Sequence, residues 1–333
     1  MRSIFFLACI LLVILVSGCQ TGGFRRSGQD TRTYDFHTGS DGLVMTFLPG
    51  NPPPRIYEGD SLHLVMEYAN KGATPIEGGL FYVSGYDPQY IHLSPSGSTG
   101  TAFNAEGKSV FNPQGELSQV IEFTDPAVEM PPNTDRFRQI FKVSSCYPYK
   151  TEASAQVCVD PDPRGLEVED KVCVMGNIGL KTQGAPVAVT SVEQEAARDQ
   201  IQFKVHVSNV GRGTVLAAGG DIVSYSGDIS PSSLGIPIAN CHRDLTREQI
   251  DKVYIRARVS GQELECFPRL IRLNPSGSGF SFCRLTLSTM STRVLDAYMT
   301  NLDVDLYYGY RDTITVPVEV LKLPGGLTPY GYR

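Results

Sequence analysis

The sequence predicts an all-β protein made of two tandem β-sandwiches, with one short helix in the second. Two observations carry this prediction: stretches of alternating apolar and polar residues recur along the chain, and a thirteen-residue pattern occurs twice. Alternation with a period of two residues is typical of a strand that buries one face. The 33 glycines and 22 prolines supply turn residues between such strands.

The repeated pattern lies at residues 60–72 and 199–211. Each copy opens on Asp, has Asn ten residues later and ends on Gly, as Asp60, Asn70 and Gly72 and again as Asp199, Asn209 and Gly211. The apolar residues between them alternate: Leu62, Leu64, Met66 and Tyr68, and then Ile201, Phe203, Val205 and Val207. Each copy therefore predicts a half-buried strand that runs into a turn. The repetition predicts two related modules.

The chain begins with an apolar segment typical of an export signal. Arg2 is the only charged residue before an apolar run over residues 4–16, which is too short to span a bilayer comfortably. The run ends in Val16-Ser-Gly-Cys19, which resembles a prokaryotic lipobox. The resemblance implies cleavage before Cys19 and attachment of lipid to its sulfur. The alternatives are an uncleaved hydrophobic anchor and an ordinary signal peptide, and either would also export the rest of the chain.

The domain boundaries follow from these patterns and from shifts in composition. Residues 20–42 are rich in Gly, Ser, Thr, Gln and Arg, and this composition favours a flexible tether. We expect a signal peptide over residues 1–18, the tether over 19–42, a first sandwich over 43–160, a cysteine-containing connector over 161–184, a second sandwich over 185–323 and a C-terminal tail over 324–333.

In the first sandwich we expect strands at residues 43–48, 62–69, 79–83, 117–123 and 137–144. Residues 94–113 are polar and rich in Gly and Ser, so they predict a long loop. The stretches 137–146 and 153–159 predict either a hairpin or an extension of the sheet.

In the second sandwich we expect strands at residues 187–193, 201–208, 253–259, 280–288, 302–308 and 313–321. The last two would form a hairpin across residues 309–312, where a glycine stands. The short helix is expected over residues 245–252, because Thr246 is followed three residues later by Gln249 in a capping-box pattern.

These features resemble a known group of domains. Ile56-Tyr-Glu-Gly-Asp60, the alternating strand and Asn70-Lys-Gly72 look like the opening of immunoglobulin-like domains of prokaryotic surface proteins, most closely the cell-adhesion-related (CARDB-type) domains. The second module shares Asn209-Val-Gly211 and has a tyrosine-rich end. The resemblance implies immunoglobulin-like sandwiches with an extracellular spacer, adhesion or assembly role, and it implies no catalytic residue. Residues 94–113, the cysteine-bearing segment and the helix depart from the simplest version of these domains.

Six cysteines remain once Cys9 has left with the signal peptide and Cys19 carries lipid: Cys146, Cys158, Cys173, Cys241, Cys266 and Cys283. An even number in an exported chain predicts up to three disulfides. We expect one pair within the first three, one within the last three and one bridge between the groups, with the connectivity left open. A zinc site is disfavoured, because no two cysteines have C-x₂-C spacing.

Two groups of residues are candidates for a ligand or partner site. Asp160, Asp162, Glu167, Glu169 and Asp170 form an acidic cluster that suits calcium, although a solvated connector is the simpler interpretation. Tyr330 and Tyr332 in the tail are residue types enriched at interfaces, although a frayed terminus is the default. The sequence has no metalloprotease, serine-hydrolase or P-loop motif, so we expect no catalytic residue and no cofactor.

The function that these observations favour is that of a lipid-anchored structural, spacer, adhesion or assembly module on the extracytoplasmic side of the cell membrane. Its partners would be the membrane, through the anchor, and other envelope proteins. Nucleic acid is not expected, because the net charge is −6 and the pI about 5.5. The alternative is a lipoprotein that captures a small molecule, peptide or glycan, and a pocket lined by Tyr and Phe between the modules would favour it.

Overall fold

Two long strands organise the fold. The computed structural model describes residues 35–115, 117–161, 171–197, 200–218, 235–287 and 296–323. The chain divides into residues 1–34 and residues 35–333, and the description that follows concerns the second unit. This unit is all-β, with several antiparallel sheets arranged in a sandwich-like way, as the alternating patterns predict.

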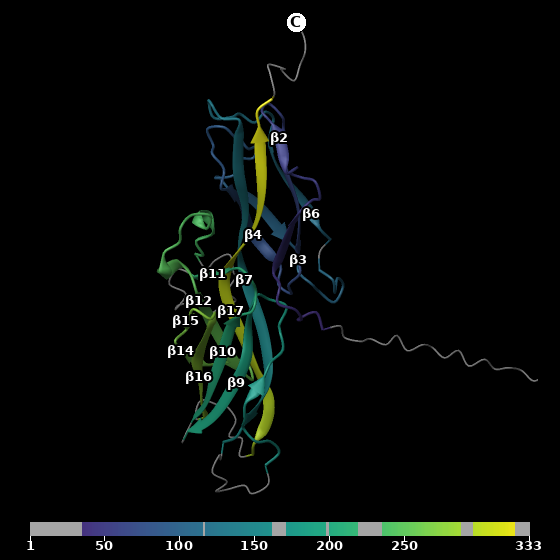
Figure 1. The fold of residues 1–333 in the computed structure, drawn as a ribbon. Helices are drawn as coiled ribbons and strands as arrows, with labels where there is room; N and C mark the ends of the chain where they lie inside the picture. The colour runs from purple at the N-terminus through teal and green to yellow at the C-terminus, as the bar shows by residue number, and fades with distance from the viewer. Residues whose placement is uncertain are drawn as a thin grey trace, which may run out of the picture. The chain divides into compact units, whose positions relative to one another are not determined.

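Strands β7 (Arg136–Val159) and β17 (Tyr298–Leu321) each contain 24 residues and pair with one another along their whole length. Arg136 lies opposite Leu321 at one end, and Val159 lies opposite Tyr298 at the other. At about 3.3 Å per residue, such a strand is roughly 80 Å long when extended. Figure 1 shows β7 (teal) and β17 (yellow to olive) running side by side through the fold. We call this pair the ribbon.

The ribbon belongs to a nine-stranded sheet in the order β13-β12-β17-β7-β4-β5, with three further strands paired beside this path. Strand β4 pairs with the first half of β7, and β12 pairs with the first half of β17. The remaining bounds are β2 (Arg55–Tyr57), β4 (Ile76–Ser84), β5 (Thr101–Ala105), β11 (Thr214–Leu216), β12 (Lys252–Val259), β13 (Gln262–Glu263) and β15 (Leu270–Arg272).

Two smaller sheets complete the fold. One has the order β1-β3-β6 and consists of β1 (Leu43–Phe47), β3 (Leu62–Asn70) and β6 (Gln119–Asp125). The other has the order β14-β16-β10-β9-β8 and consists of β8 (Ile178–Gly179), β9 (Val187–Ala197), β10 (Gln200–Asn209), β14 (Glu265–Phe267) and β16 (Ser278–Thr286). Strands β3 and β10 carry the repeated sequence pattern. Their predicted apolar faces are buried.

The core lies between the sheets. Tyr68 of β3 packs edge-on against Phe81 of β4 and Phe103 of β5, with ring centroids 4.9 and 5.5 Å apart. Buried residues of β3, β7, β10 and β17 belong to one continuous hydrophobic cluster. The apolar burial that stabilises the fold is therefore shared along the ribbon.

Four tyrosines sit in the middle of the ribbon, namely Tyr147 and Tyr149 on β7 and Tyr308 and Tyr310 on β17. Tyr147 lies opposite Tyr310, Tyr149 lies opposite Tyr308, and all four are buried. Burial raises the pKa of each hydroxyl, and that of Tyr310 reaches about 12. The tyrosines thus remain neutral hydrogen-bonding groups at ordinary pH.

The hydroxyls of these tyrosines make matching hydrogen bonds to the repeated segments and to strands β1 and β9 beside them. The backbone N–H of Leu43 donates to Tyr147 over 3.0 Å, and that of Val187 donates to Tyr308 over 3.3 Å. The other two hydroxyls donate to the asparagines of the repeat: Tyr149 to Asn70 over 3.4 Å and Tyr310 to Asn209 over 3.3 Å. The repeat therefore extends to Tyr-x-Tyr in both long strands.

The hairpin expected across residues 309–312 is wrong, because these residues continue β17 and pair with residues 145–148 of β7. Gly309 serves close packing here, since a Cβ atom on it would run into Leu216 and Ile236. Of the two alternatives for residues 137–146 and 153–159, the extension is correct, because both belong to the single strand β7.

Three smaller expectations also change. The loop over residues 94–113 contains strand β5. The expected helix is one 3₁₀ turn, η4 (Arg247–Gln249), in which the Thr246 N–H donates to the Gln249 side chain over 3.0 Å; η3 (Ile238–Asn240) is a second such turn. Residues 35–42, assigned to the tether, lie against the fold, where Gly184 donates to the carbonyl of Gly39 over 3.0 Å.

Candidate functional site

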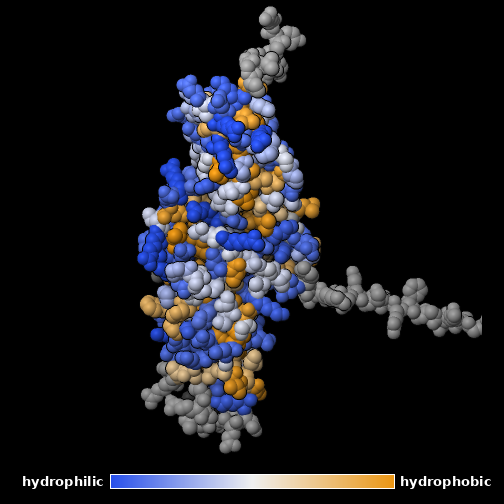
Figure 2. Space-filling view, in the orientation of Figure 1, coloured by the Kyte–Doolittle hydropathy of each residue, from blue (hydrophilic) through white to orange (hydrophobic). Residues whose placement is uncertain are grey.

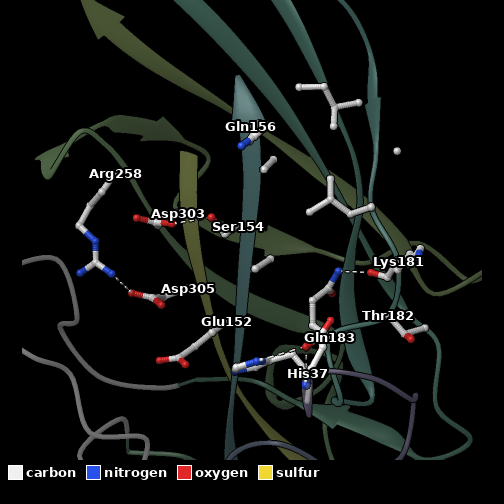
Figure 3. Close-up of a pocket in the computed structure, with 16 residues that line it drawn as sticks. His37, Glu152, Ser154, Gln156, Lys181, Thr182, Gln183, Arg258, Asp303 and Asp305 are labelled. Atoms are coloured by element: carbon white, nitrogen blue, oxygen red, sulfur yellow. Dashed lines mark hydrogen bonds and ion pairs between the residues drawn. The ribbon is translucent and has the colours of Figure 1, made fainter. Parts of the chain in front are cut away.

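A groove of about 620 Å³ lies beside the second half of β7. Its lining residues are Asp35, His37, residues 152–156 of β7, residues 178–183, Arg258 of β12, and Asp303 and Asp305 of β17. Figure 3 shows Glu152, Ser154 and Gln156 along β7 on one side of the groove and Lys181, Thr182 and Gln183 on the other. Five separate stretches of the chain therefore meet at this groove.

One wall of the groove is an unpaired strand edge. On one side β7 pairs with β17 along its full length. On the other side β4 pairs with β7 only over residues 142–146. Among the described residues, no strand pairs with this second side of β7 over residues 150–158. A strand edge of this kind exposes a row of backbone donors and acceptors.

Even-numbered residues of β7 direct their backbone groups toward this edge. The carbonyl of Lys150 accepts a hydrogen bond from the Thr74 hydroxyl over 2.8 Å. At the far end, Cys158 donates its N–H to the Gln194 side chain over 3.4 Å, and its carbonyl accepts from the same amide over 3.1 Å. In an antiparallel ladder both backbone groups of a residue point to the same side. Glu152, Ser154 and Gln156 therefore present their backbone groups to the groove.

The opposite wall is held in place by β9. Ile178 and Gly179 of β8 pair with Val192 and Ser191, and Leu180 donates its N–H to the carbonyl of Thr190 over 2.9 Å. Gln183 extends this contact, because its side-chain amide exchanges two 3.0 Å hydrogen bonds with the backbone of Val189. A Cβ atom placed on Gly179 would meet nothing within 4 Å, so there is open space at this wall.

The groove is closed at both ends by side chains that cross from β7 to β9. Gln194 bridges to Cys158 at one end, and Thr151 donates to the carbonyl of Val187 over 2.6 Å at the other. Between these ends lie residues 152–156. The open stretch of the edge is therefore five residues long, which is an ordinary strand length.

Carboxylates outnumber cations in the groove. Asp35, Glu152, Asp303 and Asp305 line it together with Lys181 and Arg258, which gives a formal charge of −4 + 2 = −2 with His37 neutral. Asp305 is compensated by Arg258 at 2.9 Å and Lys150 at 3.3 Å, and Lys150 also forms an ion pair with Glu152. Asp303 accepts a 2.8 Å hydrogen bond from Ser154, and no cation of the described part forms an ion pair with it. Asp303 therefore remains available to a positively charged group that enters the groove.

The six predicted cysteines are all paired. Cys158 bonds to Cys173, Cys266 to Cys283, and Cys146 to Cys241. This arrangement agrees with the expectation of one pair in each group and one bridge between them. The bridge attaches β7 to the end of η3, and the Cys158–Cys173 bond joins the end of β7 to the segment that becomes the far wall of the groove.

The other predicted site residues contribute little to the groove. Asp160 of the calcium cluster is buried in an ion pair with Lys171 at 2.7 Å, whereas Asp162, Glu167, Glu169 and Asp170 lie outside the described residues. Within the described residues, no group of three or more metal-ligating side chains occurs. Cys19, Tyr330 and Tyr332 also lie outside them.

The histidines are mostly involved in structural contacts. His63 contacts Glu122 at 2.6 Å, and His206 contacts Glu193 at 2.8 Å, both on polar strand faces. His242 stacks on Tyr82, and burial lowers its pKa. His37 alone of the five lines the groove, although its position in the expected tether predicted no such role.

The surface offers a second, less defined candidate. Figure 2 shows hydrophilic residues over most of the visible face, with hydrophobic residues in smaller groups. Phe267 and Phe280 are exposed on the outer side of the five-stranded sheet, and Lys204 lies over the ring of Phe280 at 5.2 Å. Scattered exposed apolar residues of this kind are ordinary on protein surfaces. No helix among the described residues is long and apolar enough to cross a membrane.

Comparison with known proteins adds no assignment. No family model matches the chain, and no curated protein matches it. Among solved structures, the secreted serine protease VesC from Vibrio cholerae aligns with 82% of this chain and 49% of its own, at 9% identity and a TM-score of 0.18. The alignment thus spans about half of that protein, and a TM-score this low supports no inference about fold or activity.

Proposed function

We propose that the chain is a lipid-anchored extracytoplasmic protein that serves as a structural and assembly module of the cell envelope. In this proposal two immunoglobulin-like sandwiches, made by the two repeats, share the ribbon. The observation that carries the proposal is the full-length pairing of β7 with β17 across 24 residues.

Shared strands suit a protein that holds other components at a fixed separation. Modules joined by a simple linker move relative to one another by default. Here each long strand supplies one half to each repeat, so bending between the repeats would break backbone hydrogen bonds and disturb the buried tyrosines. The Cys146–Cys241 bond adds a covalent tie to the middle of β7.

Export and anchoring are supported by separate features. Three disulfides are typical of a protein that works in an oxidising compartment. The lipobox at Cys19 supplies one anchor point, and residues 20–34 would then separate the lipid from the fold by at most about 3.3–3.6 Å per residue.

The experiment is to isolate the full chain from its native membranes after growth with radioactive palmitate, with Cys19→Ala as the matched control. We expect label and membrane attachment in the wild type only, and recovery together with a stoichiometric envelope protein after mild cross-linking. Unlabelled wild-type protein would refute the anchor. Labelled protein recovered without any stoichiometric partner would refute the assembly role.

A further inference from the structure

We propose that the groove beside β7 binds an extended, positively charged peptide segment of a partner protein, which adds as a strand to the β7 edge over residues 152–156. This inference rests on the proposed assembly role and specifies the chemistry of the partner. Strand addition is a common way for a sheet to recognise a peptide, because backbone hydrogen bonds supply affinity and alternate side chains supply specificity.

The backbone geometry supports an added strand. Glu152, Ser154 and Gln156 point both backbone groups at the groove, and no hydrogen bond to these groups is found within the described residues. At the next even position, Cys158, the side-chain amide of Gln194 already makes the two hydrogen bonds that a neighbouring peptide group would make. At Cys158 the backbone N–H and C=O of the edge are therefore hydrogen-bonded to the Gln194 side chain. Over residues 152–156 the corresponding backbone groups are available to an added strand.

The shape of the groove favours one strand over a second sheet. The segment of residues 178–183 forms a wall facing β7, so the flat edge of another copy would collide with it. The inward-facing lining residues of β7 are the small Ala153 and Ala155, and the space at Gly179 is open.

The charge of the groove favours a peptide segment that carries Lys or Arg side chains. Asp303 of β17 and Glu152 of β7 lie on the solvent side of the sheet; Glu152 is paired with Lys150, whereas Asp303 forms no ion pair with a described residue. Successive residues of the added strand would point alternately into the groove and toward these carboxylates. A segment with Lys or Arg at every second position would bring its long cationic side chains across β7 toward Asp303, whereas a segment with Glu there would be repelled.

The experiment measures binding of two fluorescent, end-capped heptapeptides to the purified full chain by anisotropy. One peptide alternates lysine with valine and the other alternates glutamate with valine. We expect the lysine peptide to bind at least tenfold more tightly than the glutamate peptide, and we expect Asp303→Asn to weaken its binding at least threefold. Equal binding of the two peptides would overturn the proposal.

The backbone contact is tested by Ser154→Pro, with Ser154→Ala as the matched control. Proline removes the N–H that faces the groove and leaves the bonds to β17 in place. Pro148 already occupies an even position of β7, so the strand accommodates this residue type. We expect a loss of at least tenfold in affinity for Ser154→Pro and less than twofold for Ser154→Ala. Wild-type affinity in a folded Ser154→Pro protein would contradict strand addition.

A second measurement applies if Ser154→Pro does not fold. The lysine peptide is synthesised with N-methyl groups on alternate amides, which removes the donors along one edge. We expect this peptide to lose at least tenfold in affinity for the wild-type chain, and unchanged affinity would overturn the proposal. A chain that co-purifies with an envelope partner yet binds neither peptide would refute this inference and leave the proposed function standing.

Discussion

At the scale of single residues, the two Asn-x-Gly turns have the same physical task. Each asparagine accepts a hydrogen bond from a buried tyrosine and donates to the carbonyl four residues on, Asn70 to Thr74 over 2.7 Å and Asn209 to Gly213 over 3.0 Å. The following glycine lets the tyrosine hydroxyl approach the backbone. A side chain at Gly72 or Gly211 would occupy the position of that hydroxyl.

The substitution Gly72→Ala should therefore lower the free energy of unfolding by roughly 1–3 kcal/mol, since it overpacks a buried site, and Gly211→Ala should act similarly. At Gly72 the new Cβ would also meet the backbone carbonyls of Asp41 and Gly184. Urea unfolding provides the measurement. Gly176→Ala is the control, because a Cβ there meets no atom within 4 Å, and it should change stability by less than about 0.5 kcal/mol. Equal effects at all three positions would contradict this role of the repeat.

At the scale of elements, the disulfides connect strands over very different lengths of chain. The Cys146–Cys241 bond closes a sequence separation of 95 residues, whereas the Cys266–Cys283 bond joins directly opposite residues of β14 and β16 across a separation of 17. Closing a longer loop removes more entropy from the unfolded chain. The two bonds should therefore differ in how much they stabilise the fold.

Replacing Cys146 and Cys241 with alanine should cost about 1.5 kcal/mol more stability than replacing Cys266 and Cys283, from the logarithmic dependence of closure entropy on loop length. All four cysteines are buried, so the alanine pairs are matched in packing. Denaturant unfolding of the two double variants under non-reducing conditions gives the difference. A larger loss from the shorter loop would show that local strain or packing at β14 outweighs chain entropy.

At the scale of the whole folded unit, the ribbon makes the two repeats depend on one another. Its buried residues belong to a hydrophobic cluster that extends through both repeats. Neither repeat can unfold without losing the pairing partner of the other. The folded unit should therefore unfold in a single cooperative transition.

Inserting Gly-Ser-Gly between Pro148 and Tyr149 should break this coupling. An odd insertion shifts the register of β7 and turns its following side chains to the opposite face. Calorimetry should then show two transitions, or one with a van't Hoff enthalpy well below the calorimetric value. The same insertion between Ser260 and Gly261, in the turn between β12 and β13, is the control and should leave one transition. A single transition in the Pro148 variant would mean that the repeats are coupled by other contacts.

The sequence by itself determined the local features of this protein. Alternating apolar residues predicted the strands now seen as β1, β3, β4, β9, β10, β12 and β16, because the period of two follows from strand geometry whatever the partner. The repeat at Asp60 and Asp199 identified equivalent strands, and the grouping of the cysteines agreed with their pairing.

Only the tertiary structure decided that β7 and β17 are continuous and that a groove lies beside them. Glycine serves turns and close packing alike, so the residues around Gly309 predicted a hairpin although Leu216 and Ile236 occupy the space beside it. The groove unites His37, residues 152–156, residues 178–183, Arg258 and Asp303, which are far apart in the chain. Whether a strand edge is paired depends on which strands arrive beside it, and no local pattern carries that information.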